Sequence, residues 1–197
     1  MRLSRSRVKK MNKSKDSVKK GKKGLILVNT GNGKGKTTAA MGLALRAAGR
    51  NLKVLILQFI KGPWKSGEVK VLEKLRPLIE IEQLGLGFIK FRDGKMLDRE
   101  KQLISARESL EYALNKIEGG KYDLVILDEI NNLMGMGLLK VEDVIGLVKN
   151  KPEALNIMLT GRNAPEELIE IADTVTEMKE VKHAFSSGIK ARKGIEF

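Results

Sequence analysis

The chain has 197 residues, 42% of them hydrophobic, which is enough for one domain with a hydrophobic core. It has no cysteine, so disulfides, thiolate metal sites and a cysteine nucleophile are excluded, and the expected compartment is the cytoplasm. The formal net charge of +14 is concentrated in residues 1–24, which hold eleven Lys or Arg against Asp16, whereas the rest of the chain carries only +4.

This charge distribution divides the chain into a basic, flexible N-terminal arm, residues 1–23, and a catalytic domain, residues 24–197. A basic run without aromatic residues is usually solvated, although it can also bind nucleic acid, anionic lipid or the enzyme's own polyphosphate ligand. The arm is not a signal peptide, because no apolar run of about seven residues follows it. No stretch approaches the roughly eighteen apolar residues of a membrane span, so we expect a soluble protein without a membrane partner.

After residue 24, short apolar runs alternate with helical patterns, which is typical of a parallel sheet covered by helices. A long helix is predicted from the helical spacing of apolar residues over Leu103–Ile117, closed by Gly119-Gly120. A later helix is predicted with Asn163 as its N-cap and Pro165 in its first turn. The predicted strands are Leu25–Asn29, Val54–Phe59, Ile79–Gln83, Leu124–Asp128, Asn156–Thr160 and Thr174–Met178. These elements predict an α/β fold, a three-layer domain with a mostly parallel central sheet.

The strongest functional signal is a phosphate-binding loop. The run Thr-Gly-Asn-Gly-Lys-Gly-Lys-Thr-Thr starts at Thr30, directly after a predicted strand and before an apolar helix, which is the context of a Walker A loop. Its glycines let backbone N–H groups turn toward phosphate oxygens, the helix adds its positive end, Lys36 adds a charge, and Thr37 is the expected magnesium ligand. Thr30 replaces the glycine that begins the general pattern. The predicted nucleotide-binding residues are Gly31, Asn32, Gly33, Lys34, Gly35, Lys36, Thr37 and Thr38.

A second motif, Leu124–Glu129, has the Walker B form: a buried strand that ends in two carboxylates. In open parallel sheets ligands bind beyond the carboxyl ends of the strands, so Asp128 and Glu129 should emerge beside the phosphates. Carboxylate oxygens are hard ligands, and we expect both residues to hold magnesium directly or through water.

These two motifs define a nucleotide site without naming a reaction, since ATPases, kinases, GTPases and transferases share them. One alternative is a P-loop ATPase or nucleic-acid-binding module that uses the basic arm, which predicts ADP release stimulated by DNA or RNA. The body lacks the interleaved aromatic residues and basic face of such a binder, which makes nucleic acid an unlikely partner. Another alternative is a nucleotide-gated scaffold that binds ATP and turns nothing over.

A family resemblance extends from Gly24 to Phe197. Four blocks carry it, and they are Gly31–Thr38, Phe59–Glu68 (FIKGPWKSGE), Asp128 with Leu159–Leu168 (LTGRNAPEEL), and Thr176–His183 with Gly188–Ala191 and Lys193–Glu196. In this combination the chain resembles the P-loop family of ATP:corrinoid adenosyltransferases.

The resemblance implies a RecA-like sheet, a homodimer, and transfer of the 5′-deoxyadenosyl group of ATP to the Co(I) of a corrinoid, in cobalamin biosynthesis or salvage. It also implies Mg²⁺ or Mn²⁺ and an electron donor such as a reduced flavoprotein. Cobalt attacks the ribose 5′ carbon and triphosphate leaves. Because cobalt is the nucleophile, the protein needs no base; it needs alignment and positive charge on the leaving group.

Carried onto this sequence, the resemblance assigns catalytic roles to Lys36, Thr37 and Glu129. Arg162 follows a predicted strand in the Thr-Gly-Arg-Asn turn, which makes it a candidate for phosphate contact, with a structural salt bridge as the alternative. Asn163, beside it in the same turn, is a further predicted ligand-binding residue. Lys61 and Glu68 flank Trp64 in the loop after the second predicted strand, where we expect substrate contact. Trp64 packs either beneath the nucleotide or corrinoid or in the core. Corrinoid contact is implied for Phe88.

Two departures from the family pattern stand out. The chain has His183-Ala184-Phe185-Ser186 where the family usually has His-Pro-Phe-Asp, and Gly87-Phe88-Ile89-Lys90 where it has Gly-Phe-Thr-Trp. An aromatic side chain near the lower cobalt face would discourage water ligation; Phe88 remains, and Phe91 is a candidate to compensate for Lys90. For His183, the only histidine, we expect an orienting or packing role rather than cobalt ligation. The surrounding polar segment, Glu180–Phe197, is a lid, a substrate loop or a surface tail.

Overall fold

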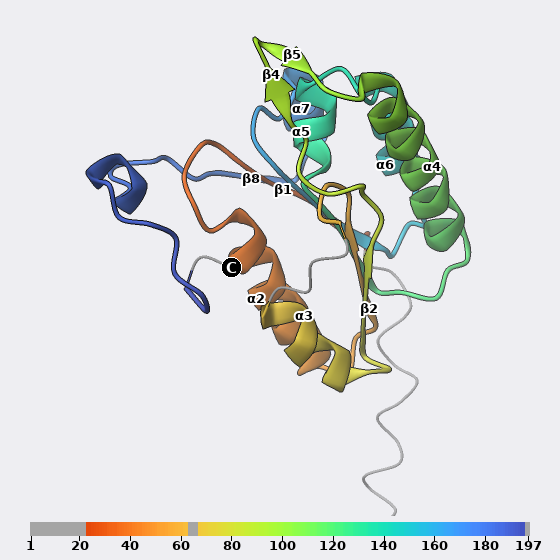
Figure 1. The fold of residues 1–197 in the computed structure, drawn as a ribbon. Helices are drawn as coiled ribbons and strands as arrows, with labels where there is room; N and C mark the ends of the chain where they lie inside the picture. The colour runs from red at the N-terminus through yellow and green to blue at the C-terminus, as the bar shows by residue number, and fades with distance from the viewer. Residues whose placement is uncertain (1–22, 63–66, 196–197) are drawn as a thin grey trace, which may run out of the picture.

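The computed structural model describes residues 23–62 and 67–195. Within these residues, six parallel strands form one sheet in the order β3-β2-β6-β7-β1-β8 (Figure 1). The strands are β1 (Ile26–Thr30), β2 (Val54–Gln58), β3 (Ile79–Gln83), β6 (Leu124–Asp128), β7 (Asn156–Thr160) and β8 (Thr174–Glu177).

Helices cover both faces of this sheet (Figure 1). On one face lie α2 (Lys36–Ala48) and α3 (Gly67–Leu72), the latter followed by a 3₁₀ turn at Glu73–Leu75. The other face is covered by α4 (Arg99–Glu118), α5 (Ile130–Gly135), α6 (Val141–Lys149) and α7 (Glu166–Ile171). The three-layer α/β architecture predicted from the sequence is confirmed, and the main sheet is wholly parallel.

The two hydrophobic cores follow from the alternation of side chains along each strand. In β2, Leu55 and Leu57 pack into the core under α4 to α7, whereas Val54 and Ile56 pack into the core under α2 and α3. Every residue of β2 and β6 is buried, because central strands of a parallel sheet are covered on both faces. Continuous apolar runs were therefore the right signal for these strands.

The predicted strands match the observed ones to within one residue at either end. Three short helices, α3, α5 and α6, were not predicted, nor was a hairpin made of β4 (Phe91–Arg92) and β5 (Lys95–Met96). Strands of two residues are too short for an alternating pattern, so the hairpin left no periodic signal. Among the described residues, no helix is both long enough and apolar enough to span a membrane.

The predicted N-cap of α7 was wrong. The helix begins at Glu166, and Pro165 rather than Asn163 occupies the N-cap position. Asn163 lies two residues earlier in the left-handed region, with φ 54°. The backbone here serves a tertiary contact: the N–H of Ala164 donates to the hydroxyl of Thr30 at 3.1 Å, which ties this turn to the end of β1.

Candidate active site

The residues of both nucleotide motifs meet at one edge of the sheet. All six strands run parallel, so their carboxyl ends lie together, and β7 separates β1, which leads into the phosphate loop, from β6, which ends in Asp128. The hydroxyl of Thr37 donates to a carboxylate oxygen of Asp128 at 2.9 Å. This bond joins residues 91 positions apart and brings the two motifs into one site.

The phosphate loop curls around the amine of Lys36. The loop turns through left-handed glycines, Gly31 (φ 92°) and Gly35 (φ 109°), and Gly35 is the N-cap of α2. The buried Lys36 amine donates to the carbonyls of Gly31 at 2.6 Å and Gly33 at 2.7 Å. The free N–H groups at the start of α2 and the helix dipole make this end of the helix attractive to an anion.

The loop glycines also make room for the chain that follows β8. A Cβ atom on Gly31 or Gly33 would lie 2.5 or 2.7 Å from the carbonyl oxygen of Met178, closer than real Cβ contacts allow. The N–H of Gly33 donates to that same carbonyl at 2.6 Å, and the N–H of Met178 donates to Thr30 at 2.8 Å. The segment around Met178 therefore packs directly against the phosphate loop, a contact that the sequence motif did not indicate.

Asp128 is fully buried and held on both carboxylate oxygens. One oxygen accepts from the hydroxyls of Thr37 at 2.9 Å and Thr160 at 2.7 Å; the other accepts from the amide of Gln58 at 3.0 Å. Gln58 in turn accepts from Gln83 at 3.2 Å. Because the Thr37 hydroxyl donates its hydrogen to Asp128, the lone pairs of its oxygen can still bind a cation. Gln58 and Thr160 were missed from the sequence.

Glu129 lies beside this centre in a strained backbone conformation. It is the N-cap of α5 with φ 69°, a left-handed conformation that is uncommon outside glycine. Burial, and next the charge of Asp128, raise the pKa of Glu129, while the positive charges of Lys36, Lys61 and Arg162 oppose this shift. Its carboxylate accepts from the amide of Asn132. Glu129 is thus a half-buried acid whose charge interacts with those of three cations.

The cations respond to the same surroundings. Burial lowers the pKa of the Lys36 amine; the charge of Glu129 acts against this, and the charge of Arg162 adds to it. Arg162 follows β7 and is exposed to solvent. The charge of Arg162 thus influences the pKa of both Lys36 and Glu129. Its contact with phosphate stays a prediction.

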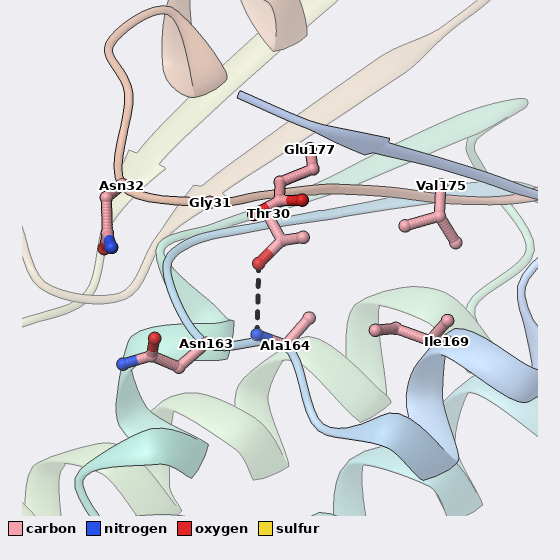
Figure 2. A pocket seen from close by; sticks show the side chains of 8 residues that line it. All are labelled: Thr30, Gly31, Asn32, Asn163, Ala164, Ile169, Val175 and Glu177. Carbon is pink, nitrogen blue, oxygen red and sulfur yellow. Dashed lines mark hydrogen bonds between the residues drawn. The ribbon is translucent and has the colours of Figure 1, made fainter. Parts of the chain in front are cut away.

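A cavity of about 320 Å³ opens beside the phosphate loop, between the end of β1, the turn before α7, and β8 (Figure 2). Asn32 lines it from the loop and Asn163 from the facing turn, while Val175 and Ile169 give it an apolar side (Figure 2). Asn163 lines this cavity together with Thr30, Gly31 and Asn32 of the phosphate loop, and its ligand binding stays a prediction.

The comparisons with known proteins agree with this geometry. The family model for ATP:corrinoid adenosyltransferase BtuR/CobO/CobP matches residues 22–197. The chain belongs to the ATP:corrinoid adenosyltransferase family. A corrinoid adenosyltransferase of Escherichia coli K12 is 37% identical over 191 residues, covering 97% of this chain and 94% of that protein. One from a Sinorhizobium species is 40% identical over 183 residues, covering 92% and 84%.

A solved structure supports the fold alone. The flagellar accessory protein FlaH from Methanocaldococcus jannaschii matches with a TM-score of 0.51 at 14% sequence identity, over 89% of this chain and 78% of that one. Two proteins this different in sequence share an architecture rather than a reaction. The adenosyltransferase assignment therefore rests on the family match and the curated relatives.

Four further site residues were predicted on the segments that follow β2 and β3: Lys61, Trp64, Glu68 and Phe88. Lys61 forms an ion pair with Glu68 at 3.1 Å, so these two residues are partners across the loop after β2. Phe88 is 79% exposed on the segment after β3. Trp64 lies outside the described residues.

The segment that carries Phe88 is packed against the Lys61 loop. A Cβ atom on Gly62 would lie 2.8 Å from the Cα of Gly87, so the two backbones approach closely. Lys90 and Phe91 are also exposed, the latter by 54%. Phe88 and Phe91 therefore both lie on the surface of the protein.

His183 has a local structural role. It is the N-cap of a 3₁₀ turn at Ala184–Ser187, and its Nδ1 accepts from the N–H of Phe185 at 3.1 Å. This bond joins His183 to the turn that follows it, and its role toward the corrinoid stays a prediction. Ser186 lies in the same exposed turn, and the segment as a whole lies on the surface.

Proposed function

We propose that this adenosyltransferase moves the 5′-deoxyadenosyl group of ATP to the Co(I) of a corrinoid and releases triphosphate. The observation that carries the proposal is the bond between Thr37 and Asp128, which unites the phosphate loop and the acidic strand end in a chain of this family. Cobalt is the nucleophile, so the protein's task is to hold the ribose 5′ carbon in line and to stabilise the leaving triphosphate.

The proposed triphosphate site consists of the N–H groups at the start of α2, the amine of Lys36 and the guanidinium of Arg162. Support comes from the helix terminus and from the position of both charges near Glu129. In this structure the Lys36 amine binds loop carbonyls, and we infer that it turns to phosphate oxygens when ATP binds. Positive charge that is already in place lowers the barrier for loss of an anionic leaving group.

A magnesium or manganese ion fits beside Thr37. Among the described residues no three acidic or histidine side chains gather into a metal cage. A hydroxyl, one or two carboxylates and phosphate oxygens are, however, the usual surroundings of nucleotide-bound Mg²⁺. We propose Thr37 as the direct ligand, Asp128 as the acceptor that orients its hydroxyl, and Glu129 as a ligand through water. The ion would neutralise charge on the triphosphate.

We propose that the corrinoid binds at the surface that carries Phe88, with Lys61, Trp64 and Glu68 contacting substrate. The exposure of Phe88 and the close packing of its segment against the loop after β2 support this location. Phe91 is the proposed substitute for the aromatic residue that Lys90 replaces.

The remaining expectations concern partners and compartment. A homodimer is supported by large apolar side chains on the segment after β8, where Val181 is 91%, Phe185 76% and Ile195 78% exposed. An electron donor such as a reduced flavoprotein is proposed because the reaction consumes Co(I). The cytoplasm is proposed because the chain has no cysteine.

Product analysis tests the reaction. With ATP, magnesium and a chemically reduced corrinoid, we expect an adenosylated corrinoid with a light-sensitive spectrum and intact triphosphate, which anion-exchange chromatography separates from ADP. A phosphate loop binds polyphosphate without dictating which bond breaks. Stoichiometric ADP and phosphate without a cobalt–carbon bond would refute the proposal and favour the ATPase alternative.

A further inference from the structure

One amide side chain joins two residues of the proposed site. Asn132 lies in α5, and its Nδ2 donates to the carboxylate of Glu129 while its Oδ1 accepts from the main-chain N–H of Arg162 at 2.5 Å. Glu129 directly follows β6, and Arg162 follows β7. Asn132 therefore bridges the ends of two neighbouring strands at the carboxyl edge of the sheet.

The chemistry of the partners determines the orientation of this amide. A main-chain N–H can only donate, so the oxygen of Asn132 must face Arg162, and its NH₂ group must then face Glu129. An ionised carboxylate can only accept, which makes Glu129 the right partner for that NH₂ group. Among residues of this size and shape, asparagine alone offers a donor to one side and an acceptor to the other.

The turn that carries Arg162 is shaped to make this contact. Gly161 has φ 133°, and a Cβ atom there would lie 2.8 Å from Asn132 Oδ1 and 2.9 Å from the Asn132 main-chain nitrogen. The neighbouring Asn131 donates to the carbonyl of Gly161 at 3.4 Å. The absence of a side chain at residue 161 thus lets the Arg162 backbone approach α5.

We infer that Asn132 is a positioning residue, which holds the Glu129 carboxylate and the Arg162 backbone in one fixed arrangement beside the phosphate loop. The inference rests on the roles proposed above for Glu129 and Arg162 and extends them. If one amide orients both groups, its loss should disturb the acid and the cation together. A displaced Arg162 would weaken ATP binding, and a displaced Glu129 would alter the magnesium requirement.

The test is a set of double-mutant cycles with Asn132→Leu, Arg162→Ala and Glu129→Gln. Adenosylation of a reduced corrinoid gives kcat and KM for ATP, and calorimetry gives ATP affinity at several magnesium concentrations. Losing hydrogen bonds to charged or fixed partners is expected to lower kcat/KM by about tenfold to a hundredfold. We expect this loss to shrink when Arg162→Ala or Glu129→Gln is already present, because the group being positioned is then gone.

Two further variants separate positioning from folding. Asn156 makes the same kind of bridge at the opposite end of β7, accepting from Leu25 at 3.1 Å and donating to Asp123 at 3.0 Å. Asn156→Leu should lower the melting temperature and leave the kinetics unchanged. Asn132→Asp keeps the acceptor for Arg162 and places a second carboxylate against Glu129, so it should alter the magnesium dependence more than ATP affinity.

The inference would be overturned if Asn132→Leu lowered kcat/KM equally in the wild type, in Arg162→Ala and in Glu129→Gln. It would also be overturned if Asn132→Leu lowered the melting temperature and left the kinetics as in the wild type. Failure of the underlying site looks different: Arg162→Ala and Glu129→Gln would then leave ATP binding and turnover unchanged on their own. Failure of the proposed reaction would be visible in the unmodified protein, which would form no adenosylated corrinoid.

Discussion

Replacing Lys36 by methionine removes a charge and leaves most of the side chain in place. The amine binds two loop carbonyls, at 2.6 and 2.7 Å, and the residue is 7% exposed. Its methylene stem lies in the first turn of α2, where methionine is a comparable helix former. Lys36→Met therefore tests the charge with little change to packing.

The structure predicts different sizes for the effects on stability and on catalysis. Each hydrogen bond of a charged group contributes about 1.5–3 kcal/mol to stability. Burial acts in the opposite direction, because it disfavours the charged amine and lowers the pKa of Lys36. The net loss of stability should therefore be smaller than the two hydrogen bonds alone would give. In the transition state, one preorganised charge on the leaving group is worth ~3 kcal/mol, or roughly a hundredfold in rate. Lys36→Met should therefore reduce kcat/KM strongly and the free energy of unfolding much less.

Adenosylation kinetics and thermal unfolding, measured on the same preparation, test this expectation. Lys101→Met is the matched control, because the ion pair of Lys101 with Asp98, at 3.8 Å, is exposed to solvent and its loss should change neither measurement. Wild-type kcat/KM in Lys36→Met would refute the assignment of the phosphate loop. A collapse in melting temperature would instead show that Lys36 acts mainly on the fold.

Two other substitutions test the packing and the electrostatics of the site. Gly33→Ala should weaken both folding and ATP binding, because the new Cβ would lie 2.7 Å from the Met178 carbonyl oxygen. The control is Gly42→Ala, inside α2 with open space around it, which should raise the free energy of unfolding by ~1 kcal/mol. Similar shifts in melting temperature for both variants would contradict the close packing of Met178 against the phosphate loop. Burial raises the pKa of Glu129, so the folded protein binds that proton more tightly than the unfolded chain, and stability is lost as the carboxyl ionises with rising pH. Glu129→Gln should therefore raise the free energy of unfolding at neutral pH in urea titrations, with a gain that vanishes below about pH 4; a gain independent of pH would refute this reasoning.

The sequence was sufficient for features that depend on neighbouring residues. A continuous apolar run predicted the buried strands β2 and β6, because both faces of such strands are covered. The loop from Gly31 to Thr38 was recognisable because its glycines, lysine and threonines act through spacing along the chain. The predicted pairing of this loop with Asp128 followed from a general property of parallel sheets, in which the carboxyl ends of strands share an edge.

Features that depend on distant residues were decided by the tertiary structure. Gln58 bonds to Asp128 across 70 residues and Thr160 across 32. Gln58 belongs to no motif, and the block that contains Thr160 gave no sign of its bond to Asp128. Met178 packs against the phosphate loop because β8 pairs with β1. Asn163 does not cap α7, and the next residue, Ala164, donates its N–H to Thr30 instead. The order of the strands in the sheet determines which side chains meet at its carboxyl edge, and this order, β3-β2-β6-β7-β1-β8, differs from the order along the chain. A local sequence pattern identifies a strand but not its neighbours in the sheet. The hydrogen bonds between these distant residues could therefore not be predicted.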